Sequence, residues 1–440
     1  MRLRILLINP WIYDFAAFNL WAKPLGLLRV AEYLSSFDVE LLFIDCTDSC
    51  TAGRFGAGKY RTEDIPKPDI LQAVPRRFKR YGIGTDEFAR QVRAAMPFDA
   101  VMMTSVMSYW YPGVQAAVEM IRELAGDVPV ILGGIYATLY PEHGIKASGA
   151  DFVFRGPLAG GLNFALATFG FKLKRKREEI PYYRLNLYSD CRFAPLLTST
   201  GCPFRCAYCA SELLSGGKCC RRTPDEVLKE VSELYYQSVG QGVRDYAFYD
   251  DALLYDADNH IKPILRGIAD AGLPVRFHTP NGLHARFVDE EVARLMQRTN
   301  FKTVRLSLET TDGDRQEDTG AKVTNSDLEK AVALFRRCGF TKNEIGVYLM
   351  YGLPGQELSE VMEGIEFLKA LAVKIYLAEF SPVRGTRAWN ELVRDGTIDD
   401  ALDPLLTNNT VFAFLYSGYD LQAVQSLKLQ VKAYNGPRLS

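Results

Sequence analysis

The sequence lacks a membrane segment, a secretory signal and a strong net charge. Its longest candidate apolar run, residues 101–118, is broken by polar side chains and by Pro112, so it is unsuited to span a bilayer. The apolar run near the amino terminus stops at Pro10, which is too short for a secretory signal. The formal net charge of -1 gives no bulk attraction for nucleic acid. We therefore expect a cytoplasmic protein with a small-molecule substrate, no nucleic-acid partner and no membrane span.

Histidine is also scarce, with four residues in the chain, whereas cysteine is unusually grouped. The nine cysteines are an odd number, which does not suggest a disulfide framework in a chain without a secretory signal. Five of the nine fall between Cys202 and Cys220. This clustering indicates metal or redox chemistry rather than scattered core thiols.

The first 170 residues alternate buried strands with amphipathic helices. Continuous apolar runs predict strands at 3–8, 39–44, 100–104, 129–132 and 151–154, and helical spacing predicts helices at 24–34, 114–124 and 140–147. This alternation implies an α/β fold with a Rossmann-like, doubly wound parallel sheet. Residues 53–83 are polar and rich in glycine and proline, which predicts an inserted loop.

The rest of the chain repeats the alternation after a charged linker, residues 171–190. Strands are predicted at 194–199, 245–249, 275–279, 303–308, 344–349 and 374–379, and helices at 223–239, 258–271, 288–298, 325–338 and 357–371. Six strand–helix units over residues 191–400 predict a partial (β/α)6 barrel, whose chemistry would lie at the carboxyl ends of its strands. Residues 401–440 form a carboxyl-terminal extension with no clear assignment.

Three cysteines follow the first strand of this second region. Cys202, Cys206 and Cys209 have the spacing C-x3-C-x2-C, and three thiolates within eight residues suit three corners of an iron–sulfur cube. The fourth iron then keeps an open position for a ligand. A structural zinc site would need a fourth ligand such as Cys219 or Cys220, but the zinc spacing is absent and no histidine lies between 144 and 259. Inert core thiols fit poorly with a loop that contains glycine and proline.

This segment resembles the defining motif of the radical S-adenosylmethionine (SAM) superfamily, with Tyr208 as the aromatic residue before the third cysteine. The resemblance covers about residues 190–395. It implies that the three cysteines hold a [4Fe–4S] cluster and that SAM chelates the open iron. Reductive cleavage of SAM would give methionine and a 5′-deoxyadenosyl radical, with flavodoxin or ferredoxin as the electron donor.

The resemblance also implies residues that contact SAM. Asp250 and Asp251 end the second strand, where they would accept from the SAM amino group, although capping of a helix is an alternative. Asn281 ends the third strand at the barrel mouth. Ser307 and Glu309 alternate with leucines, so they share a face that we expect to point into the barrel. Glu309 would accept from the ribose hydroxyls, or it is a structural glutamate paired with an arginine.

Two further segments match the family. Gly352 and Pro354 belong to a stretch that would lie beside the adenine, although an ordinary turn explains both residues. In contrast, the adjacent pair Cys219 and Cys220 has no counterpart in the motif. Vicinal cysteines cannot readily supply two corners to one cluster, so we expect them to have a packing role.

The first region resembles the cobalamin-binding domain of one large radical SAM class over about residues 1–165. Gly133 and Gly134 follow a strand and would let cobalamin approach the backbone, while Ser105 and Thr138 would bond to a corrin side chain or the nucleotide tail. The D-x-H-x-x-G motif is absent, so any cobalt would lack a lower histidine ligand. The alternative is a domain that keeps the fold without the cofactor.

These features predict a radical SAM enzyme that transfers a methyl group from cobalamin to an unactivated carbon. A cobalamin-free radical rearrangement and a non-catalytic iron–sulfur redox sensor are the alternatives. A methylthiotransferase would need three cysteines in the first region, and only Cys46 and Cys50 occur there.

Overall fold

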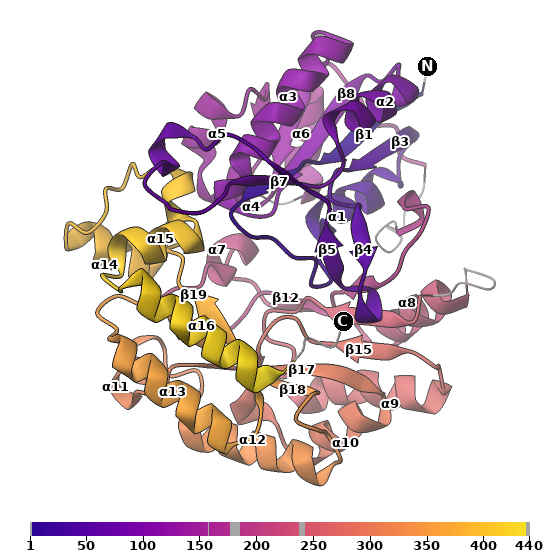
Figure 1. Cartoon of the computed structure of the whole chain (residues 1–440). Helices are drawn as coiled ribbons and strands as arrows, with labels where there is room; N and C mark the ends of the chain where they lie inside the picture. Colours follow the sequence, from indigo (N-terminus) through magenta and orange to yellow (C-terminus); the bar gives the residue numbers. More distant parts are fainter. Residues whose placement is uncertain (1, 157, 177–184, 237–242, 437–440) are drawn as a thin grey trace. The chain divides into compact units, whose positions relative to one another are not determined.

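The computed structural model describes residues 2–156, 158–176, 185–236 and 243–436 (Figure 1). Its internal contacts divide the chain into two units. The first unit comprises Met1–Gly53, Ala57–Cys191 and Leu402–Asn408, and the second comprises Arg54–Gly56, Arg192–Ala401 and Asn409–Ser440. Each unit is built on its own parallel sheet.

The sheet of the first unit has the strand order β10–β9–β8–β1–β3, and all of its pairs are parallel. Its strands are β1 (Leu3–Asn9), β3 (Val39–Asp45), β8 (Ala100–Ser105), β9 (Val130–Gly133) and β10 (Phe152–Val153). Ile5, Leu6, Leu7 and Ile8 are all fully buried, as a strand covered on both faces requires. The predicted doubly wound sheet is therefore confirmed.

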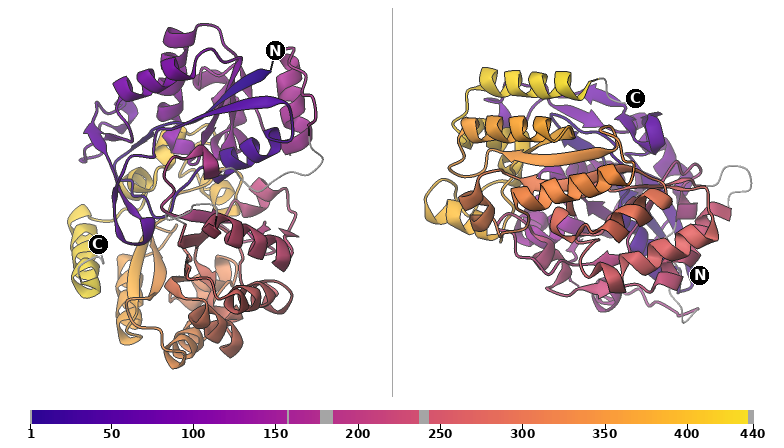
Figure 2. Two further views of the ribbon diagram at one scale, coloured as in Figure 1. Left: turned by 90° about the vertical axis from the view of Figure 1, so that its right-hand side faces the viewer. Right: turned by 90° about the horizontal axis from the view of Figure 1, so that it is seen from below.

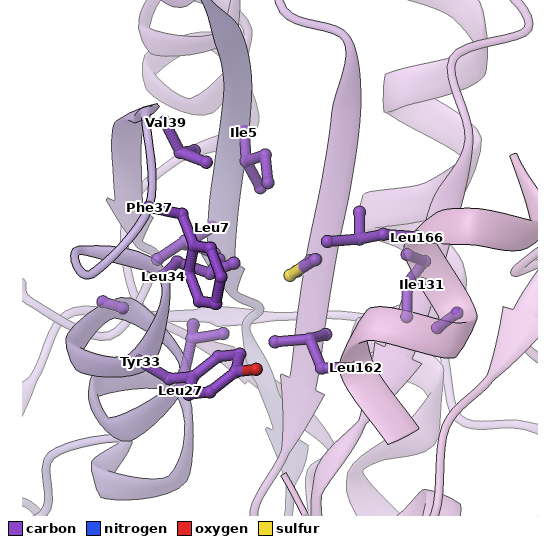
Figure 3. Packing of buried hydrophobic residues seen from close by; sticks show 13 residues of the cluster. Ile5, Leu7, Leu27, Tyr33, Leu34, Phe37, Val39, Ile131, Leu162 and Leu166 are labelled. Carbon is purple, nitrogen blue, oxygen red and sulfur yellow. The ribbon is translucent and has the colours of Figure 1, made fainter. Parts of the chain in front are cut away.

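Helices cover this sheet because their apolar stripes match the buried strand residues. Leu34 of α1 (Leu25–Leu34) and Leu166 of α6 (Leu158–Thr168) pack in one cluster with Leu7 (Figure 3). The remaining helices of this unit are α2 (Thr85–Ala95), α3 (Tyr111–Ala125), α4 (Gly134–Leu139) and α5 (Pro141–Ala147), with 3-10 turns at Asp69–Leu71, Ser108–Trp110, Leu185–Leu187 and Pro404–Thr407.

The predicted inserted loop, residues 53–83, contains three short strands that form antiparallel pairs. They are β5 (Gly58–Tyr60), β6 (Thr62–Asp64) and β7 (Lys79–Tyr81). β5 pairs with β4 (Cys50–Ala52), which precedes the insertion, and β7 pairs with β6 and with β2 (Ile12–Asp14). Each strand spans three residues, which is too few to give a readable apolar alternation.

The second unit is a six-stranded parallel sheet with the order β11–β14–β15–β17–β18–β19, and β16 extends it beside β17. The bounds are β11 (Ala194–Leu196), β14 (Asp245–Phe248), β15 (Arg276–His278), β16 (Leu283–His284), β17 (Phe301–Glu309), β18 (Ile345–Tyr351) and β19 (Lys374–Glu379). Each of the six strands on this path was predicted, and the partial barrel is confirmed.

Helices follow the strands as predicted. They are α8 (Pro224–Tyr236), α9 (Ile261–Ala271), α10 (Glu290–Arg298), α12 (Asn325–Arg337) and α13 (Leu358–Ala370), with the shorter α7 (Ser211–Ser215), α11 (Gly313–Asp318) and α14 (Arg387–Arg394). Short 3-10 turns lie at Ala257–Asn259 and Ala285–Phe287. A capping box of Thr324 and Asp327 starts α12, because each side chain satisfies a backbone N–H of the first turn. Residues 237–239, the end of the first predicted helix, lie outside the described residues.

The carboxyl-terminal extension supplies two helices to the second unit, α15 (Asn409–Tyr416) and α16 (Leu421–Asn435). In Figures 1 and 2, α16 runs alongside α13. Its last residue, Asn435, exchanges two hydrogen bonds with the backbone of Ile375 in β19, at 3.0 and 2.7 Å. In the described part of the chain, no helix is both long enough and apolar enough to cross a membrane.

Three residues from the first region of the sequence, Arg54–Gly56, belong to the second unit. The ring of Phe55 lies 5.1 Å from that of His278 and 5.0 Å from the guanidinium of Arg276. Gly56 has a φ of 81°, and a side chain there would press on Phe193 just before β11. This tripeptide therefore packs against the beginnings of the barrel strands.

Candidate functional site

The predicted cluster cysteines lie on a loop between two short strands, β12 (Ser199–Thr200) and β13 (Cys220–Arg221), which pair antiparallel. The turn into the loop requires glycine at position 201. Gly201 has a φ of 83°, and a Cβ atom there would lie 2.1 Å from the carbonyl oxygen of Lys218. The Gly-Cys pair of the motif therefore has a steric reason.

The three thiols lie close enough to interact electrostatically, since Cys209 acts on both Cys202 and Cys206. Burial raises the pKa of Cys202 to about 11, and Cys206 and Cys209 act in the same direction. Burial also raises the pKa of Cys206 and of Cys209, although the ammonium of Lys322 lowers both. Such thiols ionise readily only when a cation binds them, so the donor set suits a metal centre that displaces the protons.

Among the described residues, no three Cys, His, Asp or Glu side chains converge as the ligands of a single metal ion would. A [4Fe–4S] cube does not need that convergence, because each of its three thiolates binds a different iron. Three thiols on one short loop therefore fit the cluster by their chemistry.

The loop is held from both sides by the rest of the barrel. The backbone N–H of Ala207 donates to Thr319 at 3.0 Å, and the carbonyl of Ala207 accepts from Ala388 at 2.9 Å. Gly320 packs directly on the loop, because a Cβ atom there would lie 3.1 Å from the Cα atom of Cys206. These contacts fix the position of Cys206 from outside the motif.

Phe204, between the first two cysteines, anchors the loop in an aromatic cluster. Its ring centroid lies 4.7 Å from that of His284, 5.7 Å from Phe287 and 5.8 Å from Tyr255. Burial lowers the pKa of His284 to about 3, with Lys322 and Arg286 acting in the same direction. The imidazole of His284 is therefore neutral, and it packs with the three aromatic rings against the cysteine loop.

Tyr208 and Glu309 are brought together, as a shared site requires. Burial raises the pKa of Tyr208 well above its usual value, and the nearby Glu309 carboxylate acts in the same direction; Lys322 Nζ lies 3.3 Å from Glu309 Oε1. The glutamate is thus paired with a lysine instead of the arginine that the structural alternative assumed. Glu309 has a φ of 71° at a register shift after Ser307, so simple alternation does not describe this strand end. Positive φ at a residue other than glycine is a strain found often at functional sites.

The two aspartates after β14 have different environments. Asp250 is buried and accepts from Thr198 Oγ1 and Ser199 Oγ, each at 2.6 Å, so it fastens the strand that leads into the cysteine loop. Burial raises its pKa despite these bonds. Asp251 is exposed, accepts from Ser211 Oγ at 2.7 Å, and acts electrostatically on Cys202. Neither contact is the helix cap that the alternative assumed.

The remaining predicted SAM residues lie at the ends of neighbouring strands. Asn281 is exposed and donates to the carbonyl of Tyr249 at 3.0 Å, which joins the ends of two strands. Ser307 is buried, and Gly282 is needed beside it because a Cβ atom would lie 2.0 Å from Ser307 Oγ. Gly352, with a φ of 81°, follows β18.

Pro354 lies in the turn after β18, and Arg315 fastens this turn. Arg315 donates to the carbonyls of Pro354 and Gly355 at 2.9 and 3.0 Å, and it forms a bidentate pair with Glu360. The turn is therefore a rigid element beside the strand end. The sequence offered no signal for Arg315 or for Lys322.

A buried histidine makes the base of the cysteine loop sensitive to pH. His260 Nε2 lies 2.8 Å from Thr198 Oγ1, which itself donates to Asp250, so the imidazole donates. Burial lowers the pKa of His260 to about 4. The unfolded chain, with a histidine pKa near ~6.5, binds more protons below that pH, so the free energy of unfolding falls as the pH drops from about 6.5 towards 4.

We expect this histidine to lower the free energy of unfolding of the wild type by about 1.6 kcal/mol between pH 6.5 and pH 5. Urea unfolding at both pH values measures the loss. His260→Gln keeps an N–H donor that does not titrate, so its stability should change less over the same interval. Equal losses in both proteins would assign the pH dependence to other groups.

The predicted cobalamin residues of the first unit lie at the carboxyl ends of β8 and β9. Gly134 has a φ of 90°, and a Cβ atom there would lie 2.4 Å from Thr104 Oγ1, so no larger residue fits. Gly133 precedes α4. Ser105 Oγ donates to the carbonyl of Met107 at 2.7 Å, and Thr138 Oγ1 donates to Gly134 at 2.9 Å, so both hydroxyls support the local backbone.

The sheet reverses its strand order between β1 and β8, which is where ligands of doubly wound sheets bind. At the carboxyl end of β8, Val106 and Met107 are each 39% exposed, which is unusual for apolar residues next to a buried strand. The sequence analysis missed both residues, although their position directly after a predicted strand was available as a signal.

The other side of the reversal is closed by the protein itself. Tyr188 donates to Asp45 at 2.6 Å, and Asp45 also accepts from Asn9 at 2.7 Å. Lys23 lies 3.4 Å above the Tyr188 ring and pairs with Asp48. These bonds occupy the carboxyl ends of β1 and β3. The carboxyl end of β8, with its exposed Val106 and Met107, is therefore the better candidate for a ligand site.

Cys219 and Cys220 are both exposed, so the expected packing role is wrong. Cys220 lies opposite Thr200 in the β12–β13 pair, where its side chain has no core to fill. The strand pair is formed by the backbone, and its exposed face tolerates small polar or thiol side chains.

Three thiols on one loop beside the strand ends of a partial (β/α)6 barrel are the arrangement that an iron–sulfur barrel enzyme would need. Residues 196–368 match the family model described as Radical SAM superfamily. This part of the chain is therefore a radical SAM domain, as the cysteine motif predicts. A radical SAM domain implies the [4Fe–4S] cluster and SAM as cofactors.

Named proteins are similar to most of the chain. An uncharacterised methyltransferase of Pyrococcus horikoshii, PH0819, is 27% identical over 338 residues, which covers 68% of this chain and 70% of that protein. The cytidylyl-2-hydroxyethylphosphonate methyltransferase of Streptomyces wedmorensis is 21% identical and covers 90% of this chain and 83% of its own length.

A solved structure shares the fold. TsrM from Kitasatospora setae, a radical SAM methyltransferase determined with cobalamin and a [4Fe–4S] cluster, superposes with a TM-score of 0.64 at 17% identity. The match covers 93% of this chain and 85% of that one. It shows that this chain is similar to TsrM in fold.

Proposed function

We propose that this protein is a cobalamin-dependent radical SAM methyltransferase that methylates an unactivated carbon of a small molecule. The observation that carries this proposal is the three-thiol loop of a radical SAM barrel in one chain with a doubly wound sheet that exposes apolar residues at its switch point. The names of the relatives, and the cobalamin in TsrM, support methyl transfer.

The cysteine loop would hold the cluster through Cys202, Cys206 and Cys209. Bound there, the cluster supplies the electron that cleaves SAM, and cobalamin in the first unit supplies the methyl group. Asp251 is the aspartate available to the SAM amino group, because Asp250 is committed to Thr198 and Ser199. Its exposed carboxylate would pair with the ammonium.

The other SAM contacts follow from the same strand ends. Glu309, paired with Lys322, would accept from the ribose hydroxyls, and Asn281 and Ser307 would line the mouth. Gly352 and Pro354 would face the adenine on the turn that Arg315 fixes. In the first unit, Gly133 and Gly134 would admit cobalamin beside Val106, with Ser105 and Thr138 supporting the backbone at that edge.

We also propose the four-part division at residues 170, 190 and 400, a cytoplasmic location, and flavodoxin or ferredoxin as reductant. A small-molecule substrate is favoured over nucleic acid by the near-neutral net charge of -1.

The decisive experiment supplies SAM whose methyl group carries three deuteriums to protein purified anaerobically with cobalamin. We expect bound cobalamin in the absorption spectrum, 5′-deoxyadenosine as product, and deuterated methyl in the product of candidate substrates. Gly134→Val should lose the cobalamin spectrum, because its side chain would meet Thr104, while a cluster of normal iron content remains.

The outcomes separate the alternatives. 5′-Deoxyadenosine without bound cobalamin would replace the proposal with a cobalamin-free radical reaction. An intact cluster that yields no 5′-deoxyadenosine from SAM would favour a redox sensor.

A further inference from the structure

The inner face of the barrel carries two buried cations without a carboxylate partner among the described residues. Arg305 is 8% exposed and Lys374 is 6% exposed. Arg305 donates to the Tyr376 hydroxyl at 2.8 Å, and its guanidinium lies 4.2 Å from the centre of that ring. Within the described part of the chain, the ammonium of Lys374 forms no hydrogen bond or ion pair, whereas its backbone belongs to the β18–β19 ladder. Buried charges in proteins are normally paired with an opposite charge, so we expect an anion to bind beside these two side chains.

The strand register places the two cations at one level of the barrel. Arg305 of β17 pairs with Gly346 of β18, and Gly346 pairs with Lys374 of β19. Paired residues of parallel strands share a face, and Tyr376 lies on that face two residues after Lys374. A Cβ atom on Gly346 would lie 2.9 Å from Arg305 Nη1 and 2.5 Å from the Tyr376 ring. The absence of a side chain at Gly346 in β18 therefore leaves room for the guanidinium of Arg305 between β17 and β19.

The charges around this level repel one another. Burial lowers the pKa of Lys374, and Arg305, Lys342 and Arg54 act in the same direction. The carboxylate of Asp245, on the same inner face, is already engaged by Arg276 and by His278, which lies 2.9 Å away. An added anion would therefore gain two charge-assisted contacts without displacing an existing pair.

We propose that Arg305 and Lys374 bind the anionic group of the substrate, a carboxylate or a phosphate, inside the barrel. This inference rests on the proposed function, since it defines the substrate class of that site. The guanidinium of Arg305 donates to Tyr376 and to the carbonyl of Val304, and three of its five N–H groups remain for an oxyanion. The ammonium of Lys374 adds a point charge.

The distance to the cysteine loop suits a small substrate. The next level towards the carboxyl ends of the strands consists of Ser307, Tyr348 and Tyr376, and Glu309 lies two residues further along β17. Two residues of a strand advance ~6.6 Å, so the anion would be held roughly 7 to 13 Å below the mouth. The Tyr348 hydroxyl donates to Pro280 at 2.7 Å, which draws its ring towards β15. Tyr376 therefore lines the β19 side, along which the substrate chain would extend.

Anion binding to the reconstituted holoenzyme tests the inference without a known substrate. Isothermal titration with inorganic phosphate and, separately, with acetate at constant ionic strength distinguishes the two oxyanions. We expect saturable binding of one anion to the wild type, and at least tenfold weaker binding to Lys374→Met and to Arg305→Gln. Lys302→Met is the matched control. Lys302 lies on the same strand three residues before Arg305, so it belongs to the opposite face, and its ammonium lies 4.0 Å from Glu344.

Binding that survives in Lys374→Met, or the absence of saturable binding for both anions, would overturn the inference. Lys374→Met keeps the test available if Arg305→Gln does not fold. 5′-Deoxyadenosine formation by the wild type is measured in parallel. Its absence would count against the proposed function, whereas the titration alone decides whether the cation pair binds anions.

Discussion

Replacing any one of Cys202, Cys206 and Cys209 with alanine should reduce 5′-deoxyadenosine formation to background. Each thiolate holds a different iron, and neither Cys219 nor Cys220 lies in the motif to substitute for a missing corner. Iron and sulfide content, the absorption of the reconstituted cluster, and 5′-deoxyadenosine after reduction with SAM are the measurements. The effect should exceed ~1,000-fold, because the electron that cleaves SAM has no other source.

Cys219→Ala and Cys220→Ala are the matched controls for this result. Both thiols are exposed; Cys220 begins the strand that pairs with the start of the same loop, and Cys219 directly precedes that strand. The control variants should therefore keep the full iron content and activity. A loss in the controls equal to that in the three motif variants would mean that the ligand set is wrong, as would zinc in place of iron.

The features predicted correctly from the sequence are those encoded over short distances. The buried strand Leu3–Asn9 is recognisable in the sequence because residues 5–8 are all apolar, as a strand covered on both faces requires. The radical SAM domain was predicted from an equally local signal, the C-x3-C-x2-C spacing of three cysteines within eight residues. In both cases neighbours in the sequence supply the whole signal.

The features that were missed depend on contacts between different elements, for which the sequence has no local pattern. Lys322 reaches Glu309 at the end of β17 from the loop after α11, and Gly320 reaches Cys206 across more than a hundred residues of sequence. The packing of Arg54–Gly56 in the second unit has no local pattern either. At Glu309, a register shift breaks the alternation from which we placed Ser307 and Glu309 on one face. Periodicity alone cannot reveal such an irregularity.

The contact of Gly320 with the cysteine loop leads to a second large effect. Gly320→Val should lower the iron content several-fold and SAM cleavage by ~10- to 100-fold. The new Cβ atom would lie 3.1 Å from the Cα atom of Cys206 and 3.4 Å from the carbonyl oxygen of Arg205. Both are backbone atoms, which cannot rotate away, so the loop itself must shift. A displacement of one ligand loosens the whole cluster.

Gly339→Val separates this contact from backbone strain. Gly320 and Gly339 have φ values of 120° and 93°, so a valine is strained at either position. Nothing lies within 4 Å of a Cβ atom at Gly339. Gly339→Val should therefore lose stability in urea unfolding but retain its iron, whereas Gly320→Val loses both. Equal iron content in the two variants would show that the packing of Gly320 on Cys206 does not position the cluster ligand.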